Sequence, residues 1–145
     1  MSAYADTSFL YSLYVQQAHS AKAAAYVAAA HDAALPLTSL GRFELFNAIR
    51  LSVFRQQLKP RVAAIDVLTI KADIESGVLG VISCDWAAVH AEAERLSARH
   101  TAEGGHRSMD ILHVATALSM GAREFLSFDR NQTRLASAEG LTVKP

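Results

Sequence analysis

The sequence predicts an α/β protein with a central, mainly parallel sheet of four to five strands and helices on both of its faces. Short apolar segments alternate with longer amphipathic ones, and strands separated by helices need crossover connections, which make neighbouring strands parallel. No internal repeat or linker interrupts this alternation. Hydrophobic residues make up 51% of the 145 residues and charged residues 19%, so we expect one compact domain over residues 1–145.

Local signals set the boundaries of the predicted elements. Pro36 disfavours a helical conformation at Leu35, Pro60 suits the first turn of a helix, and Gly77 is suited to end that helix. The predicted strands cover 4–6, 35–38, 78–84, 125–128 and 141–143. The predicted helices cover 7–14, 20–34, 40–53, 60–76, 86–96 and 131–138. A further helix is capped by Ser108 and stops at Gly121, and a loop covers 103–106.

Charge and cysteine content restrict the class of protein. The 14 basic and 14 acidic residues give a formal net charge of zero, so any attraction for nucleic acid must come from local basic groups. The lone Cys84 cannot form an internal disulfide and is expected to be a small core residue. The N-terminus lacks the pattern of a secretory signal and no apolar run is long enough to span a bilayer, so we expect a cytoplasmic protein.

Four acids stand out because apolar residues surround them or a predicted strand ends at them. They are Asp6, Glu44, Asp110 and Asp129. Asp6 and Asp129 end the first and fourth strands, and Asp110 opens a helix that should abut the same edge of the sheet. Ligands of such sheets bind at the carboxyl ends of the strands. We therefore expect the four acids to converge.

Each acid also has a purely structural explanation, which is the stronger one when each is taken singly. Asp6 and Asp129 are candidates for helix N-caps. Asp110 suits a first-turn acid that complements the helix dipole, and Glu44 suits a solvated stripe. Asp85 also follows a strand and precedes a helix, and we interpret it as an N-cap.

A divalent cation would remove the repulsion between converging carboxylates. Two unit charges about 4 Å apart repel by about 4 kcal/mol at an effective dielectric near 20. Hard ions such as Mg²⁺ and Mn²⁺ suit an all-carboxylate site, and the histidines show no zinc-type pairing with a cysteine or another histidine.

Three polar residues are candidates for supporting roles. Thr7 or Ser8, directly after Asp6, would hydrogen-bond the first carboxylate or simply start the helix. His113 follows Asp110 by three residues and shares its helix face. We interpret His113 as a packed or hydrogen-bonded histidine, with a general base as the minor alternative.

The sequence around each of the four acids has a recognisable form. Residues 4–10 read Tyr-Ala-Asp-Thr-Ser-Phe-Leu, residues 43–48 read Phe-Glu-Leu-Phe-Asn-Ala, residues 107–117 read Arg-Ser-Met-Asp-Ile-Leu-His-Val-Ala-Thr-Ala, and residues 128–136 read Phe-Asp-Arg-Asn-Gln-Thr-Arg-Leu-Ala. In order and spacing they resemble the four acidic motifs of the PIN-domain family, especially the VapC-type toxins of bacterial toxin–antitoxin pairs. The third stretch is the most specific, the resemblance covers essentially the whole chain, and no acid is missing.

This resemblance implies a metal-dependent endoribonuclease. Asp6, Glu44, Asp110 and Asp129 would be the ligands, directly or through water, of one or two Mg²⁺ or Mn²⁺ ions. The metal would lower the pKa of a bound water, orient the water for in-line attack on a phosphodiester and neutralise charge on the leaving oxygen. Hydrolysis would leave a 5′-phosphate.

The resemblance also implies an RNA substrate. Single-stranded or looped RNA is expected, because a stacked duplex does not bend easily into an open acidic cleft. Arg42, Arg107 and Arg130 are nominated by position to bind the flanking phosphates.

Protein partners are implied as well. Members of this family commonly form homodimers and are silenced by a small antitoxin whose tail crosses the active site. Phe9, Tyr14, Phe46 and Phe54 are candidates for such surfaces, but their spacing favours the core.

Two other classes of protein compete with the nuclease. A non-catalytic PIN-fold module that binds RNA or protein would keep the acids as relics, and the intact acids count against it. A carboxylate-based phosphatase would need a second Asp at position 8, which is Ser, and a phospho-acceptor domain would need an acidic pair and a lysine that are not evident.

Overall fold

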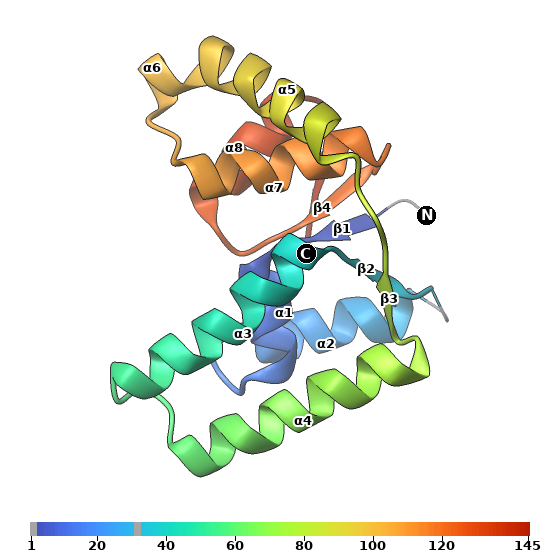
Figure 1. Ribbon diagram of the computed structural model, residues 1–145, viewed down its shortest axis with the longest axis vertical. Coiled ribbons are helices and arrows are strands. Elements are labelled where there is room, and N and C mark those ends of the chain that lie inside the picture. The colour runs from blue at the N-terminus through green and yellow to red at the C-terminus, as the bar shows by residue number, and fades with distance from the viewer. Residues whose placement is uncertain (1–2, 31–32) are drawn as a thin grey trace. The chain divides into compact units, whose positions relative to one another are not determined.

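The computed structural model describes residues 3–30 and 33–145, which divide into two compact units (Figure 1). Unit 1 contains the described residues up to Asp6 together with Ser83–Lys144, and unit 2 contains the described residues of Thr7–Ile82 and Pro145. Unit 1 is therefore assembled from two stretches of chain that are far apart in the sequence.

Unit 1 is built on a parallel three-stranded sheet with the order β1-β4-β5. Tyr4 lies opposite Phe125, and Phe125 lies opposite Val143. The elements of this unit are β1 (Ala3–Ala5), α5 (Trp86–Leu96), the π-helical turn η1 (Ser97–Thr101), α6 (Ala102–Gly104), α7 (Ser108–Ser119), β4 (Glu124–Leu126), α8 (Arg130–Ala138) and β5 (Thr142–Lys144).

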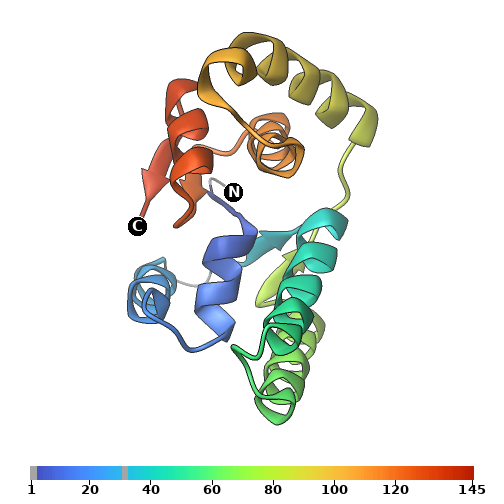
Figure 2. The same cartoon turned by 90° about the vertical axis from the view of Figure 1, so that its left-hand side faces the viewer.

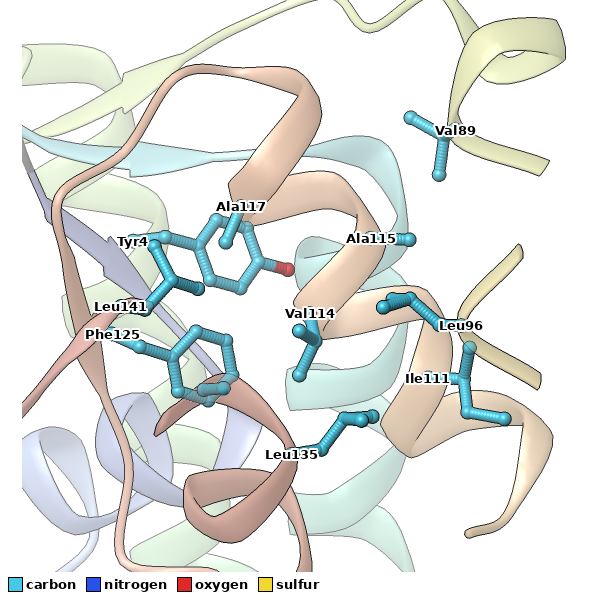
Figure 3. Close-up of a cluster of buried hydrophobic side chains, with 11 residues drawn as sticks. Tyr4, Val89, Leu96, Ile111, Val114, Ala115, Ala117, Phe125, Leu135 and Leu141 are labelled. Carbon is cyan, nitrogen blue, oxygen red and sulfur yellow. The ribbon is translucent and has the colours of Figure 1, made fainter. Parts of the chain in front are cut away.

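The core of unit 1 lies between the sheet and α7, α5 and α8. Figure 3 shows Tyr4 and Phe125 together with Val114 of α7 and Leu135 of α8, and all four side chains are buried. The rings of Tyr4 and Phe125 stack with their centroids 5.7 Å apart. This packing fixes β1 against β4, so that the residues following both strands are held by the same core.

The described residues of unit 2 form a parallel pair of strands and four helices. β2 (Leu35–Leu37) pairs with β3 (Leu79–Val81), and the helices are α1 (Thr7–Tyr14), α2 (Ser20–Ala29), α3 (Ser39–Phe54) and α4 (Pro60–Ser76). Thr38 caps α3 by accepting a hydrogen bond from the backbone N–H of Gly41, and Gly77 ends α4 with φ +82°. Helices α3 and α4 run side by side in both views (Figure 2).

The predicted alternation of strands and helices is confirmed, and every strand pair is parallel. Within the part of the chain that the structure describes, the five strands pair as one sheet of three and one of two. Asp85 caps α5 by accepting a hydrogen bond from Ala88, as interpreted from the sequence. Within residues 3–30 and 33–145, each helix is too short or too polar to traverse a bilayer.

Several predicted boundaries are wrong. The second helix ends at Ala29, whereas the prediction extended it to residue 34 across 31–32, which lie outside the described residues. The loop predicted to begin at residue 103 begins after Gly104, since the chain stays helical through η1 and α6. No helix-breaking residue precedes Gly104 in this stretch. Ser108 is the first residue of α7 and Arg107 occupies the N-cap position, without a side-chain cap.

The third and fourth strands are also shorter than predicted. β3 covers only Leu79–Val81, and Cys84 beyond it is half-buried against the core of unit 1. β4 ends at Leu126, although Ser127 still donates its backbone N–H to the carbonyl of Lys144.

Candidate active site

Asp6 directly follows β1 and is completely buried. Its backbone N–H donates to the carbonyl of Leu126 at 3.0 Å, which continues the β1–β4 pairing by one residue. The hydroxyl of Ser127 donates to Oδ2 of Asp6 at 2.5 Å. The end of one strand thus supplies the carboxylate, and the end of its neighbour supplies a donor for it.

Asp129 occupies the N-cap of α8, two residues beyond Ser127. Its Oδ1 accepts a hydrogen bond of 3.0 Å from the backbone N–H of Gln132. Its own backbone N–H donates to the Ser127 hydroxyl oxygen at 2.9 Å. Ser127 therefore joins Asp6 to Asp129, and the N-cap interpretation of Asp129 is correct as a description of its local structure.

Asp110 lies in the first turn of α7 and is 4% exposed. Its Oδ1 accepts a hydrogen bond of 3.1 Å from Nε2 of Gln132, and its Oδ2 accepts one of 3.1 Å from Nε of Arg107. Gln132 thus contacts two acids, Asp129 through its backbone and Asp110 through its side chain. We call the connected set Asp6, Ser127, Asp129, Gln132 and Asp110 the acidic network.

Gln132 has one polar atom whose hydrogen-bonding capacity is unused. The side-chain Oε1 is buried and has no hydrogen-bond partner among the described residues. Such atoms are few in folded proteins and call for a physical explanation. This oxygen belongs to the residue that links Asp110 to Asp129, so the acidic network contains an acceptor without a donor.

Glu44 lies in α3 of unit 2 and is half-buried. Its Oε1 accepts a hydrogen bond from the hydroxyl of Thr7, the residue that follows Asp6 in the sequence. The structure therefore places three of the four predicted acids in one network within unit 1, and it places Glu44 in a separate contact within unit 2.

The donor set of the acidic network suits a hard divalent cation, because carboxylate and amide oxygens are the ligands that Mg²⁺ and Mn²⁺ prefer. The acids are not gathered into a ready cluster: in the part of the chain that the structure describes, no group of three His, Cys, Asp or Glu side chains is spaced to hold a metal ion. Ser127 and Gln132 stand between the carboxylates instead.

The supporting candidates have varied surroundings. His113 is completely buried, and its Nδ1 lies 2.7 Å from the hydroxyl of Tyr4, which holds the ring in the core of unit 1. Thr7 contacts Glu44, as described above. Ser8 lies in α1, where its carbonyl accepts a hydrogen bond from the hydroxyl of Ser12.

The three nominated arginines all have exposed side chains. Arg107 is bound to Asp110 while its side chain remains 75% exposed. The guanidinium of Arg42 lies 5.5 Å from the centre of the Phe46 ring in unit 2, and Arg130 is the first residue of α8. Their contact with RNA stays a prediction.

Sequence reasoning missed Ser127 and Gln132. A signal for each was present: Ser127 is a lone polar residue in the apolar run Phe-Leu-Ser-Phe, and Gln132 follows Asp129 at the spacing of a capping box. Neither signal identifies the acid that the side chain contacts, because that depends on the pairing of β1 with β4 and the packing of α7 against α8.

The parallel sheets and the acids at the strand ends define an α/β protein with a carboxylate-rich site. The chain belongs to the PIN domain family, whose profile matches residues 3–138. A search of curated proteins finds no match to the sequence.

Two solved structures have a similar fold. The crystal structure of VapC20 from Mycobacterium tuberculosis, a toxin that cleaves the sarcin-ricin loop, is 19% identical with a TM-score of 0.66, and the match covers 99% of this chain and 100% of that one. PAE2754 from Pyrobaculum aerophilum is 17% identical with a TM-score of 0.63, covering 99% of this chain and 89% of that one. At these identities the similarity shows the fold alone.

Proposed function

We propose that the protein is a metal-dependent endoribonuclease of the VapC type, acting in the cytoplasm as the toxin of a toxin–antitoxin pair. The acidic network carries this proposal, because three carboxylates, which follow β1, lie in α7 and follow β4, are joined by one chain of hydrogen bonds. The PIN family match spans both units, which supports a single nuclease domain over residues 1–145.

In this proposal Asp6, Asp110 and Asp129, completed by Glu44, hold Mg²⁺ or Mn²⁺. When bound, the ion supplies Lewis acidity that activates water and stabilises charge on the leaving oxygen. The Ser127 hydroxyl fixes the orientation of the Asp6 carboxylate, and Gln132 fixes that of Asp110. Such supporting hydrogen bonds position metal ligands and tune their basicity.

RNA with unstacked nucleotides is the proposed substrate, since an exposed phosphodiester must reach carboxylates that are mostly buried. Arg107 is bound to Asp110 and exposed to solvent, so it is suited to contact a phosphate next to the one that is cleaved.

An antitoxin and a second copy of the chain are the proposed protein partners. Unit 2 exposes large apolar side chains on α3 and α4, among them Phe54 at 82% and Leu68 at 67%. A groove of about 490 Å³ between these helices is lined mainly by apolar residues. Exposed apolar surface of this kind supports a protein interface. Phe9 and Phe46, the other phenylalanines that the sequence offers as candidates for such a surface, are buried in the core.

The proposal is tested by incubating the purified protein with total cellular RNA and Mg²⁺ or Mn²⁺, beside an EDTA control and the Asp110→Asn variant. Asp85→Asn is the matched control, because it makes the same chemical change at an N-cap where Asn serves equally well. We expect cleavage by the parent and by Asp85→Asn, and none with EDTA or Asp110→Asn. Folded parent protein that binds RNA but leaves it intact would instead favour the non-catalytic binding module.

A further inference from the structure

We propose that a second polar site in unit 1, which we call the Arg134 pocket, binds a backbone phosphate of the RNA beside the acidic network. This inference rests on the proposed function. The pocket has a volume of about 280 Å³ and lies among η1, α6, the loop before α7 and α8. Its polar lining consists of Arg99, His100, Glu103, Gly104, His106 and Arg134.

The backbone around the pocket is shaped to bring His106 close. A Cβ atom on Gly104 would lie 2.4 Å from Nε2 of His106, so any other residue at position 104 would require the His106 ring to move. Arg99 and His100 come from η1, a π-helical turn, and such turns often occur at functional sites. Irregular backbone on two sides therefore directs cationic and imidazole groups to one hollow.

Arg134 supplies a positive charge, and the hydrogen-bond acceptors of its side chain in the described part of the chain are uncharged. Its guanidinium donates to the carbonyl of Gly104 at 2.7 Å and to Oδ1 of Asn131 at 3.3 Å, and both acceptors are uncharged. Among the residues described by the structure, no carboxylate lies within ion-pair distance of Arg134. The planar guanidinium fork is well matched to two oxygens of a phosphate.

Arg99 and His100, on the side of the pocket formed by η1, both contact Glu139. Its carboxylate accepts a hydrogen bond from Arg95 and lies 3.5 Å from Arg99 and 2.9 Å from His100. A bound phosphate would draw Arg99 and His100 away from this carboxylate. Glu139 therefore weakens phosphate binding, and its removal should strengthen it.

His106 is a buried histidine that lies among charged side chains of both signs. Burial lowers the pKa of His106, and electrostatic interactions with Arg134 and His100 lower it further, while Asp110 acts in the opposite direction. The ring is 9% exposed, and its Nδ1 has no hydrogen-bond partner within the described residues. Arg134 on α8 and Asp110 of the acidic network thus act on the His106 ring with opposite sign.

The pocket and the acidic network are connected through two short stretches of unit 1. His106 precedes Arg107, which binds Asp110, and Arg134 lies on the helix that Asp129 caps. Arg130 and Arg134 are one turn apart on α8, or about 6 Å along its axis. An RNA strand cleaved at the acidic network can thus place a neighbouring phosphate in the Arg134 pocket.

The inference is tested by measuring the binding of a fluorescent single-stranded RNA by anisotropy, in EDTA so that no cleavage occurs, over a range of salt concentrations. Arg134→Gln should weaken binding about tenfold and reduce the slope of log K against log salt by about 0.7. Glu139→Gln should tighten binding severalfold. Arg61→Gln, the same change at an exposed residue of α4, should leave both quantities unchanged. Circular dichroism checks that each variant is folded.

Equal salt slopes for the parent and Arg134→Gln would overturn the inference. Arg134→Lys is a second variant, which keeps the positive charge but loses the planar guanidinium. Its RNA affinity should fall, while the slope of log K against log salt should equal that of the parent. A titration with inorganic phosphate, followed by NMR through the Nε–H resonance of Arg134, distinguishes the source of the ligand. A shift of this resonance with inorganic phosphate but none with RNA would reject binding of an RNA backbone phosphate.

The outcome is separable from that of the proposed function. Cleavage by the parent together with no effect of Arg134→Gln on RNA binding would reject the pocket and leave the nuclease intact. RNA binding that depends on Arg134, without any cleavage, would support the pocket and reject the nuclease.

Discussion

The hydroxyl of Ser127 donates a hydrogen bond of 2.5 Å to Oδ2 of Asp6, and these two residues follow neighbouring strands of the same sheet. Asp6 is completely buried, so its carboxylate depends on protein donors in place of water. The same hydroxyl oxygen accepts from the backbone of Asp129, which makes Ser127 the junction between the first and last of the four predicted site acids.

Replacing Ser127 by Ala should lower the free energy of unfolding by roughly 1–3 kcal/mol, because a buried carboxylate loses a donor. Urea denaturation in EDTA measures the change, and Ser137→Ala, an exposed serine of α8, is the control. Mn²⁺ should recover part of the loss if Asp6 is a metal ligand. Equal stability of the two variants would show that the Ser127 hydroxyl contributes little.

Replacing Gln132 by Glu should make the protein less stable without metal and more responsive to metal. The new carboxylate would face Asp110, with repulsion in place of a hydrogen bond. A divalent cation would relieve that repulsion, so Mn²⁺ should raise the melting temperature more in this variant than in the parent. Thermal unfolding with and without Mn²⁺ measures both effects, with Gln57→Glu at an exposed site as the control. The same Mn²⁺ response in the variant and the parent would count against Gln132 facing the metal site.

Replacing Tyr4 by Phe should destabilise the fold without slowing cleavage. The change removes the partner of Nδ1 of His113, a completely buried ring, and should reduce the free energy of unfolding by roughly 1–2 kcal/mol. We expect kcat for RNA cleavage to be unchanged at a temperature where the variant is fully folded. A lower kcat under that condition would revive the general-base role of His113.

The stability of unit 1 should depend on pH through Glu139. Burial raises the pKa of Glu139, but hydrogen bonds from Arg95 and His100 outweigh burial, and the net pKa is lowered. A carboxyl group with a lowered pKa in the folded state stabilises that state above its ordinary pKa, about 4.3, and loses this contribution as the pH falls through the folded value. Glu139→Gln should therefore be less stable than the parent at pH 7, by roughly 1 kcal/mol, and the difference should shrink below about pH 4. Denaturation at both pH values tests this, and a constant difference would contradict it.

The sequence predicts where helices and strands begin and end better than it predicts which strands pair with each other. Pro60 and Gly77 mark the ends of α4, and Asp85 marks the start of α5, because caps and breakers act locally. The three-residue strands carry no local signal for the choice of neighbour. The pairing of Tyr4 with Phe125 is decided by packing between residues that are far apart in the chain.

The candidate site divides in the same way. Asp6 and Asp129 were identified because a strand end is visible in the sequence, and Asp110 because it opens an apolar helix. Gln132 was not identified, because its amide reaches Asp110 only when α7 packs against α8. The Arg134 pocket likewise depends on the helical path through η1, because Arg99 and His100 reach the pocket from that turn. The sequence predicts only a loop over 103–106, which follows η1.

The discontinuous make-up of unit 1 has a consequence for synthesis on the ribosome. Residues 7–82 form a continuous unit that can become compact while the rest of the chain is still being made, because domains generally fold as units during translation. β1 has no partner until β4 emerges, and β5 follows only at residues 142–144. Asp6 therefore meets Ser127 only when translation is nearly finished, so an unfinished chain lacks the acidic network.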